Sequence, residues 1–316
     1  MKTSVNESAK LLCDQVQERA NLLRVGVTFS ESGSRILDFG VKTLGGIEAG
    51  LMLSKICMGA AADVELTNSD DSIWPGAQIQ VKTDMPVEAC MAAQYAGWPI
   101  QEEKYFAMGS GPMRSKRGRE HVLEVLAIQD DGHHGVGVLE TDTLPSDAIC
   151  RKIAEACKVD GSQLTLCVAP TRSIAGTIQV VARSVETCLH KMFELKFDLL
   201  RIVSGYGEAP LPPPAIDFAK GIGRTNDAIL YGGRVTLWLD ADDSEIDSIA
   251  PKIPSCSSAD WGQPFARIFK RYNYDFYKVD PGLFSPAVIS LFNLRSGKSW
   301  KVGELRPDVL RESFSN

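Results

Sequence analysis

Apolar residues recur at helical spacing in several segments of the chain. Near the N-terminus they return every three or four positions between Ala9 and Leu23, and Ser4 or Asn6 can cap this helix. Pro86 can open a later helix, because proline suits the first helical turn. Further helices are predicted over residues 45–60, 86–98, 145–159, 173–196, 265–272 and 306–314, and residues 215–233 are predicted to mix helix and loop.

Other segments alternate apolar and polar residues, or are short apolar runs, as strands do. Two hairpins are predicted, one over residues 25–40 and one over 287–305, the second turning at Ser296-Gly297. Single strands are predicted over residues 62–68, 77–84, 135–140, 164–170 and 234–242, and from residue 199 a strand leads into a proline-rich loop. Residues 105–115, "YFAMGSGPMRS", are predicted to form a glycine-rich loop.

Helices and strands therefore alternate along the chain, which predicts an α/β (mixed α+β) fold with mixed sheets. The length of 316 residues suggests two domains or one large one. We place them at residues 1–158 and 159–316, with exchange of segments between them left open. No internal repeat and no long linker is visible, so we expect the two domains to pack closely.

Composition narrows the function classes. Apolar residues make up 44% of the chain and charged residues 23%, as in ordinary globular proteins, and the net charge is −6. Nucleic-acid binders usually present a basic field, so no nucleic-acid partner is expected. The basic run "MRSKRGR", residues 113–119, is interpreted as a solvated loop, with phosphate binding as the alternative. The sequence shows neither a signal peptide nor a bilayer-spanning stretch, so a cytoplasmic protein without a membrane partner is expected.

Cysteines and histidines give no strong site signal. None of the cysteines forms a C-x-x-C pair, so we interpret them as small buried residues in a reducing compartment. They are Cys13, Cys57, Cys90, Cys150, Cys157, Cys167, Cys188 and Cys256. His133 and His134 are adjacent in a turn-rich segment without metal-ligand spacing, so an exposed loop and no metal site are expected. His190 follows Glu186 by four residues and is interpreted as a packed or surface histidine.

Three segments could hold a ligand, but each has a plain structural interpretation. "AMGSGP", residues 107–112, could present backbone amides to an anion or could simply turn. In "GIGRTND", residues 221–227, the polar residues could bond a polar ring or cap a helix that starts at Ala228. "RYNYDFYKVDPG", residues 271–282, could stack a heterocycle or form an edge strand.

Arg183 and Glu186 are the most informative charges. They lie three apart in the apolar helix predicted over residues 173–196, so they share one face. Burial disfavours an ionised carboxylate and a neighbouring guanidinium favours it. The result can be an ionised but poorly solvated carboxylate, which suits a general base. An ordinary helix salt bridge is the alternative, and spacing alone does not decide between the two.

Several blocks taken together give the chain a resemblance. In order they are "SVNESAKLL", "GGIEAGLMLSKICMG", "YFAMGSGP", "VAPTRSIAGTIQVVARSVET", "GRTNDAILYGG" and "YDFYKVDPGLFSPA". With them the sequence resembles methenyltetrahydromethanopterin cyclohydrolases over essentially its whole length. The shared order of many blocks makes the resemblance specific, although no single block does.

The resemblance implies an activity, a site and an assembly. Such enzymes add water to the cyclic methenyl cation of tetrahydromethanopterin and open one ring C–N bond, giving the 5-formyl form without a metal or dissociable cofactor. Relatives have two α/β domains with a cleft between them and form homotrimers. The positions that match the family's acid/base glutamate and its tuning arginine are Glu186 and Arg183. The physiological direction, formaldehyde oxidation or methanogenesis, stays open.

Substrate contacts are expected from the resemblance together with the side-chain chemistry. The carrier bears a phosphate in its tail and hydrogen-bonding groups on its pterin. The candidate contacts are Gly109, Ser110, Gly111, Arg114, Thr225, Asn226 and Asp227. Tyr95 joins them because it stands in "AAQYAGW", where archaeal relatives carry a lysine. If that lysine contacts the acidic tail of the carrier, a carrier with a different tail is expected here.

Two other functions remain open at this stage. The protein could be a different one-carbon enzyme acting on a pterin or folate carrier, which would not need the Arg183–Glu186 base. It could also be a non-catalytic carrier-binding protein, in which Glu186 would be dispensable. The presence of both charged residues argues against the second alternative.

Overall fold

The chain divides into two compact units, each made of more than one stretch. The computed structural model describes residues 4–275 and 278–315. Unit 1 comprises Met1–Ala62 and Glu88–Gln179, and unit 2 comprises Asp63–Val87 and Val180–Asn316. The boundary that we placed between residues 158 and 159 therefore falls inside unit 1. The physical reason is strand pairing, because the hairpin within residues 63–83 completes the sheet of unit 2.

Unit 1 is built on a six-stranded mixed sheet in the order β1-β2-β8-β7-β6-β5. Its strands are β1 (Gly26–Phe29), β2 (Arg35–Asp38), β5 (Trp98–Glu102), β6 (Tyr105–Ser110), β7 (Gly135–Glu140) and β8 (Leu164–Ala169). Strand β8 runs parallel to both β2 and β7, whereas the other neighbours are antiparallel. Every residue of β8 is buried, as expected for a central strand covered on both faces.

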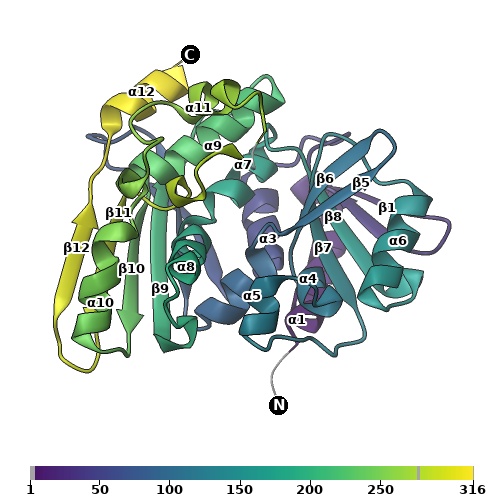
Figure 1. Ribbon diagram of the computed structural model, residues 1–316. Helices are drawn as coiled ribbons and strands as arrows, with labels where there is room; N and C mark the ends of the chain where they lie inside the picture. Colours follow the sequence, from purple (N-terminus) through teal and green to yellow (C-terminus); the bar gives the residue numbers. More distant parts are fainter. Residues whose placement is uncertain (1–3, 276–277, 316) are drawn as a thin grey trace. The chain divides into compact units, whose positions relative to one another are not determined.

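Helices cover both faces of this sheet (Figure 1). They are α1 (Val5–Glu18), α2 (Ala20–Leu23), α3 (Ile47–Cys57), the π-helix Val87–Gln94, α4 (Met113–Arg117), α5 (His121–Val125), α6 (Asp147–Cys157) and the 3₁₀ turn Gly161–Gln163. Alternate residues of β8 serve two cores: Cys167 packs with α1 and α3, and Leu166 packs with α6. The predicted cap of α1 is confirmed at Ser4, whose hydroxyl accepts from the amide of Glu7.

Unit 2 has a second six-stranded mixed sheet, in the order β12-β11-β10-β9-β4-β3. Its strands are β3 (Asp63–Asn68), β4 (Ala77–Thr83), β9 (Ile202–Pro210), β10 (Arg234–Leu239), β11 (Val288–Asn293) and β12 (Ser299–Gly303). Only β10 and β11 run parallel, and β12 returns antiparallel in the predicted hairpin. Burial alternates strictly along β10, so one sheet face is covered and the other is open.

Helices α8, α9 and α10 lie in front of the strands of this sheet, and α11 and α12 pack against α9 (Figure 1). The α-helices are α8 (Ser184–Glu194), α9 (Phe218–Gly232), α10 (Asp243–Ile249), α11 (Phe265–Arg271) and α12 (Pro307–Ser315). Short 3₁₀ turns are Leu199–Arg201, Ala250–Lys252, Ser255–Ser257 and Pro281–Leu283. The prediction of an α/β fold with mixed sheets is thus confirmed.

One local prediction is wrong, and one of the two interpretations of residues 221–227 is excluded. Residues 105–115 are not a loop but strand β6 followed by α4. Gly109 lies within β6, where a Cβ would stand 2.8 Å from the carbonyl oxygen of Trp98, so glycine serves close packing there. Residues 221–227 lie inside the continuous helix α9, which Asp217 caps, so no helix starts at Ala228. Gly223 is tolerated in that helix because Ala266 of α11 packs against it.

Candidate active site

A break in the helix predicted over residues 173–196 shapes the site. The structure has two helices there, α7 (Ile174–Val181) and α8, separated at Ala182 and Arg183. Arg183 has φ −89° and ψ 10°, and its amide bonds the carbonyl of Val180, so the helical ladder is interrupted. Glu186 consequently lies in the first turn of a new helix, where backbone amides favour a negative charge.

Arg183 and Glu186 face each other in a buried setting. Their side chains are 8% and 5% exposed, and Nη1 of Arg183 lies 3.9 Å from Oε2 of Glu186. That distance is longer than a hydrogen bond, so the guanidinium acts on the carboxylate through its charge. Val185 and Cys188, next to them on α8, are completely buried. The predicted pairing of the two residues is confirmed, and the low exposure excludes a solvated surface salt bridge.

Two glycines in β9 hold α8 close to the sheet. A Cβ at Gly205 would lie 3.0 Å from Cγ1 of Val185, and a Cβ at Gly207 would lie 2.4 Å from Oγ of Ser184. Any side chain at Gly207 would therefore push away the first turn of α8, which carries Glu186. The position of the carboxylate depends on these contacts.

We expect Gly207→Ala to disturb the site without touching its charges. The added methyl group overpacks the contact with Ser184 and should destabilise unit 2 by about 1–3 kcal/mol. Turnover should fall with it, because the first turn of α8 shifts. Chemical denaturation and steady-state kinetics measure both effects. Ser204→Ala, on the opposite and exposed side of β9, is the matched control. Equal behaviour of the two variants would contradict this account.

Lys191 is a buried cation that the sequence analysis missed. It lies on α8, 7% exposed, and its ammonium donates to the carbonyl of Gly282 at 2.7 Å and to Ser257 Oγ at 3.3 Å. Burial lowers the pKa of Lys191, and the nearby charge of Asp280 opposes that shift. These contacts anchor the segment around Gly282 to α8. Lysine in an amphipathic pattern normally predicts a solvated side chain, so no sequence signal marked it.

The loop expected to bind an anion is part of the sheet of unit 1. Gly109 and Ser110 end β6, and Ser110 Oγ lies 3.4 Å from the carbonyl of Val138 and 3.5 Å from Cys57 Sγ. Gly111 has φ +87°, a conformation that favours glycine, and leads directly into α4. The structure brings Gly109, Ser110 and Gly111 together at the end of one strand, and all three are buried.

Arg114 is fully buried and satisfied inside unit 1. Its Nε lies 3.0 Å from Oε1 of Glu120, and its Nη1 donates to the carbonyls of Met91 at 2.9 Å and Ala93 at 3.2 Å. Its guanidinium also stacks over the ring of Tyr95, 4.8 Å from the centroid. This geometry is that of a structural arginine, which corrects the interpretation of the basic run as a solvated loop. Glu120 is six residues away beyond a turn, so no periodicity predicted the pair.

Thr225, Asn226 and Asp227 lie within α9 and bond mainly to their own unit. Thr225 Oγ1 donates to the carbonyl of Gly221 at 2.9 Å, and Asn226 Nδ2 donates to that of Ile222 at 2.8 Å. Asp227 accepts from the amide of Phe265 at 2.8 Å and from the hydroxyl of Ser313 at 2.6 Å. Thr225 and Asp227 are buried and Asn226 is half-buried, so only Asn226 presents part of its amide outward.

Asp227 should make stability depend on pH. Burial raises the pKa of its carboxyl from 3.8 to about 7. Between these two pKa values the folded protein retains a proton that the unfolded chain releases. The contribution of Asp227 to the free energy of unfolding is therefore complete below about pH 3.8 and is lost as the pH rises through about 7. Asp227→Asn keeps both hydrogen bonds and cannot ionise. We expect it to unfold like wild type near pH 4 but to be more stable at pH 8, by up to ~4 kcal/mol.

Denaturant titrations at several pH values measure this difference. Asp308→Asn, a substitution of the same type on the exposed side of α12, should change stability by less than about 0.5 kcal/mol at pH 8. An Asp227→Asn variant that weakens substrate binding at unchanged stability would instead support the predicted pterin contact.

Two histidines of the chain lie beside glutamate carboxylates. His134 Nδ1 pairs with Glu7 Oε2 at 2.8 Å, and His190 Nε2 lies 3.9 Å from Glu194 Oε1. Within residues 4–275 and 278–315, no group of His, Cys, Asp and Glu side chains could hold a metal ion.

The aromatic segment 271–282 begins in α11 and ends in the turn Pro281–Leu283, and its residues 276 and 277 lie outside the described residues. Seven of the eight cysteines are buried.

Comparisons with known proteins cover nearly the whole chain. A family model described as "Cyclohydrolase (MCH)" matches residues 4–314. A protein of Rhodopirellula baltica named methenyltetrahydromethanopterin cyclohydrolase is 53% identical over 288 residues, covering 90% of this chain and 86% of that protein. A protein of the same name from Methylobacillus flagellatus is 43% identical, and the match covers 98% of this chain and 95% of that protein. Another from Methanocella arvoryzae is 41% identical, and the match covers 98% of each of the two chains. No helix in the described part of the chain is long and apolar enough to cross a membrane.

Proposed function

Since the chain belongs to the methenyltetrahydromethanopterin cyclohydrolase family, we propose that it catalyses the reversible addition of water to 5,10-methenyl-tetrahydromethanopterin, giving the 5-formyl form. The observation that carries this proposal is the match of the family model to residues 4–314 of the chain. The reaction is a hydrolysis of a cyclic amidine in one-carbon metabolism, and its substrate is a pterin.

We propose Glu186 as the group that moves protons in this reaction. The methenyl substrate is an amidinium-like cation and is already electrophilic, so it lacks only a base for the attacking water. Glu186 takes one proton from water as the O–C bond forms, which leaves a hydroxylated ring. The C–N bond then breaks, its electron pair stays on nitrogen, and Glu186 returns the proton there. The hydroxyl proton leaves to solvent as the formyl C=O forms, so cation plus water gives product plus one proton.

Burial and charge support this role. A carboxylate that is 5% exposed interacts strongly with a cationic substrate, because little water screens the pair. Arg183 at 3.9 Å and the N-terminus of α8 both favour the ionised form that accepts the proton. We therefore propose Arg183 as the residue that tunes Glu186.

The substrate contacts remain proposals of unequal strength. Asn226 and Tyr95 are half-buried and can offer polar atoms to a ligand, and Gly109, Ser110 and Gly111 form one strand end. Arg114, Thr225 and Asp227 are held by contacts within their own units, which favours structural roles. We therefore propose Asn226 and Tyr95, the two half-buried candidates, as the pterin or tail contacts to test first, with Ser110 after them because it is buried.

The experiment is a spectrophotometric assay of purified protein. Methenyl-tetrahydromethanopterin should lose its conjugated methenyl absorbance rapidly, and methenyl-tetrahydrofolate should react much more slowly. Faster turnover of the folate form would favour a different one-carbon enzyme. Tight binding without turnover of either would favour a carrier-binding protein and overturn the proposal.

We also propose a homotrimer acting in the cytoplasm, on the strength of the family resemblance. Sedimentation equilibrium should then give about three times the 34.4 kDa mass of one chain. A mass of 34.4 kDa at micromolar concentration would refute the trimer and leave the activity untouched.

A further inference from the structure

The open face of the sheet in unit 2 carries rows of aligned side chains. The strand register places Tyr206, Thr236, Ser290 and Lys301 side by side across β9, β10, β11 and β12. The next row holds Glu208, Arg234 and Val288. The two rows are two positions apart along each strand. Because successive side chains on a strand point to opposite faces, residues two positions apart share a face, and so do these two rows.

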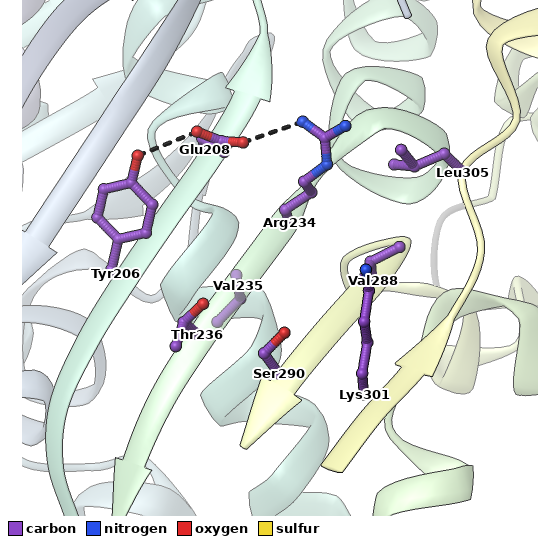
Figure 2. A pocket seen from close by; sticks show the side chains of 9 residues that line it. All are labelled: Tyr206, Glu208, Arg234, Val235, Thr236, Val288, Ser290, Lys301 and Leu305. Carbon is purple, nitrogen blue, oxygen red and sulfur yellow. Dashed lines mark hydrogen bonds and ion pairs between the residues drawn. The ribbon is translucent and has the colours of Figure 1, made fainter. Parts of the chain in front are cut away.

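A cavity of about 220 Å³ lies over these rows. Short side chains, Thr236, Ser290 and Val288, form its floor, and longer ones surround them. Figure 2 shows the surrounding residues Tyr206, Glu208, Arg234, Lys301 and Leu305. The hollow therefore follows from the alternation of short and long residues in the two rows. Its volume suits a small organic molecule rather than a single water.

The two cations that line this cavity differ in their partners. Arg234 pairs with Glu208 through Nη1, and its Nη2 lies 3.8 Å from Oδ2 of Asp70. The carboxylate of Glu208 is fully used, because Oε1 pairs with Arg234 Nη1 at 3.0 Å and Oε2 accepts from Tyr206 at 3.0 Å and Gln78 at 3.1 Å. Lys301 has no hydrogen bond or ion pair with any residue that the structure describes, and neither do the hydroxyls of Ser290 and Thr236. One unpaired ammonium and two hydroxyl donors thus meet at this cavity.

We propose that this cavity binds a small organic anion, a carboxylate or a phosphate monoester. Lys301 supplies the charge, and Ser290 and Thr236 donate hydrogen bonds to the anionic oxygens. Tyr206 and Leu305 enclose the remainder of the ligand. No part of the proposed hydration reaction requires this site.

The cavity is separate from Glu186. Along β9, Gly205 and Gly207 face α8. Tyr206 and Glu208 alternate with these glycines and face the cavity. The sheet of unit 2 therefore stands between the bound anion and the helix that carries Glu186. Binding of the anion should consequently survive Glu186→Gln.

Isothermal titration with inorganic phosphate and with succinate tests the proposal at low salt, where exposed charges are least screened. We expect one site per chain for at least one probe, and the stronger of the two identifies the class. Lys301→Met should weaken binding about tenfold or more, since one charge-assisted bond is lost. Lys298→Met removes an equal charge from the same hairpin, where Lys298 pairs with Asp243 at 2.7 Å, and should bind as wild type.

A second variant acts through volume instead of charge. Ser290→Leu fills the floor of the cavity and should abolish binding without a change in Tm. Absence of binding by both probes, or equal loss in Lys301→Met and Lys298→Met, would overturn the proposal. A change in sedimentation of Lys301→Met without anion binding would also overturn it and would assign this face to contacts between copies of the chain.

Discussion

Glu186→Gln is expected to lower kcat by about 10²–10⁴-fold, the usual contribution of a positioned acid/base group. Glutamine has the same shape but cannot accept the proton of the attacking water or return it to the leaving nitrogen. Its amide also lacks the charge that stabilises the cationic substrate, so kcat/KM should fall at least as far. Loss of methenyl absorbance under single-turnover conditions measures the chemical step directly.

The matched control for this variant is Glu194→Gln on the same helix. Glu194 is 51% exposed at the other end of α8, so its replacement should leave kcat unchanged. Glu194→Gln should keep the wild-type Tm within a few degrees, whereas Tm must be followed for Glu186→Gln, because it leaves the buried Arg183 without its charge partner. A Glu186→Gln enzyme with wild-type kcat would reduce the Arg183–Glu186 pair to a structural ion pair, while the family assignment would stand.

Arg183→Met is the variant with the next largest expected effect. Two charges about 4 Å apart interact by up to about 4 kcal/mol at an effective dielectric constant of 20, so the cation strongly favours ionised Glu186. Without it, Glu186 takes up a proton at higher pH, and less of the base form is present at neutrality. We expect kcat at pH 7 to fall by about 10- to 100-fold and the acid limb of its pH profile to move to higher pH.

The pH profile separates tuning from simple damage. Removing one partner of a buried ion pair can also destabilise the fold by about 3–5 kcal/mol, so Tm must be followed in parallel. Arg183→Lys keeps the charge and should restore most of the acid limb. A folded Arg183→Met variant could instead have low kcat at every pH and an unshifted pH profile. In that case Arg183 would contribute in some way other than by favouring ionised Glu186.

Periodicity predicted most elements of this fold because burial is periodic in them. Strands β7, β8 and β10 and helices α3 and α6 each present a regular apolar pattern, and the prediction needed nothing else. The prediction of elements failed where a glycine was interpreted from its sequence neighbours alone. Gly109 and Gly223 look like loop residues, yet one meets the backbone of Trp98 and the other a facing helix. These partners are distant in sequence, so no local pattern predicts them.

The site shows the same division. Arg183 and Glu186 are three residues apart, and their contact followed from helical spacing even though the helix is broken between α7 and α8. Arg114 was predicted to lie in a solvated loop because "MRSKRGR" is strongly basic, but burial under Tyr95 and pairing with Glu120 depend on tertiary packing. The cavity at Lys301 depends on the register of four strands, which the sequence does not reveal.

The hairpin β3–β4 also affects how this protein is made. Its sheet partner β9 begins at Ile202, 119 residues after β4 ends at Thr83. At about 5–20 residues per second, a ribosome needs several seconds to tens of seconds to deliver that partner. During this interval unit 1 can be completed, while the edge of β4 that β9 later covers stays unpaired and open to pairing with other chains. Nascent chains stalled between these two strands should therefore be the preferred clients of trigger-factor-like chaperones.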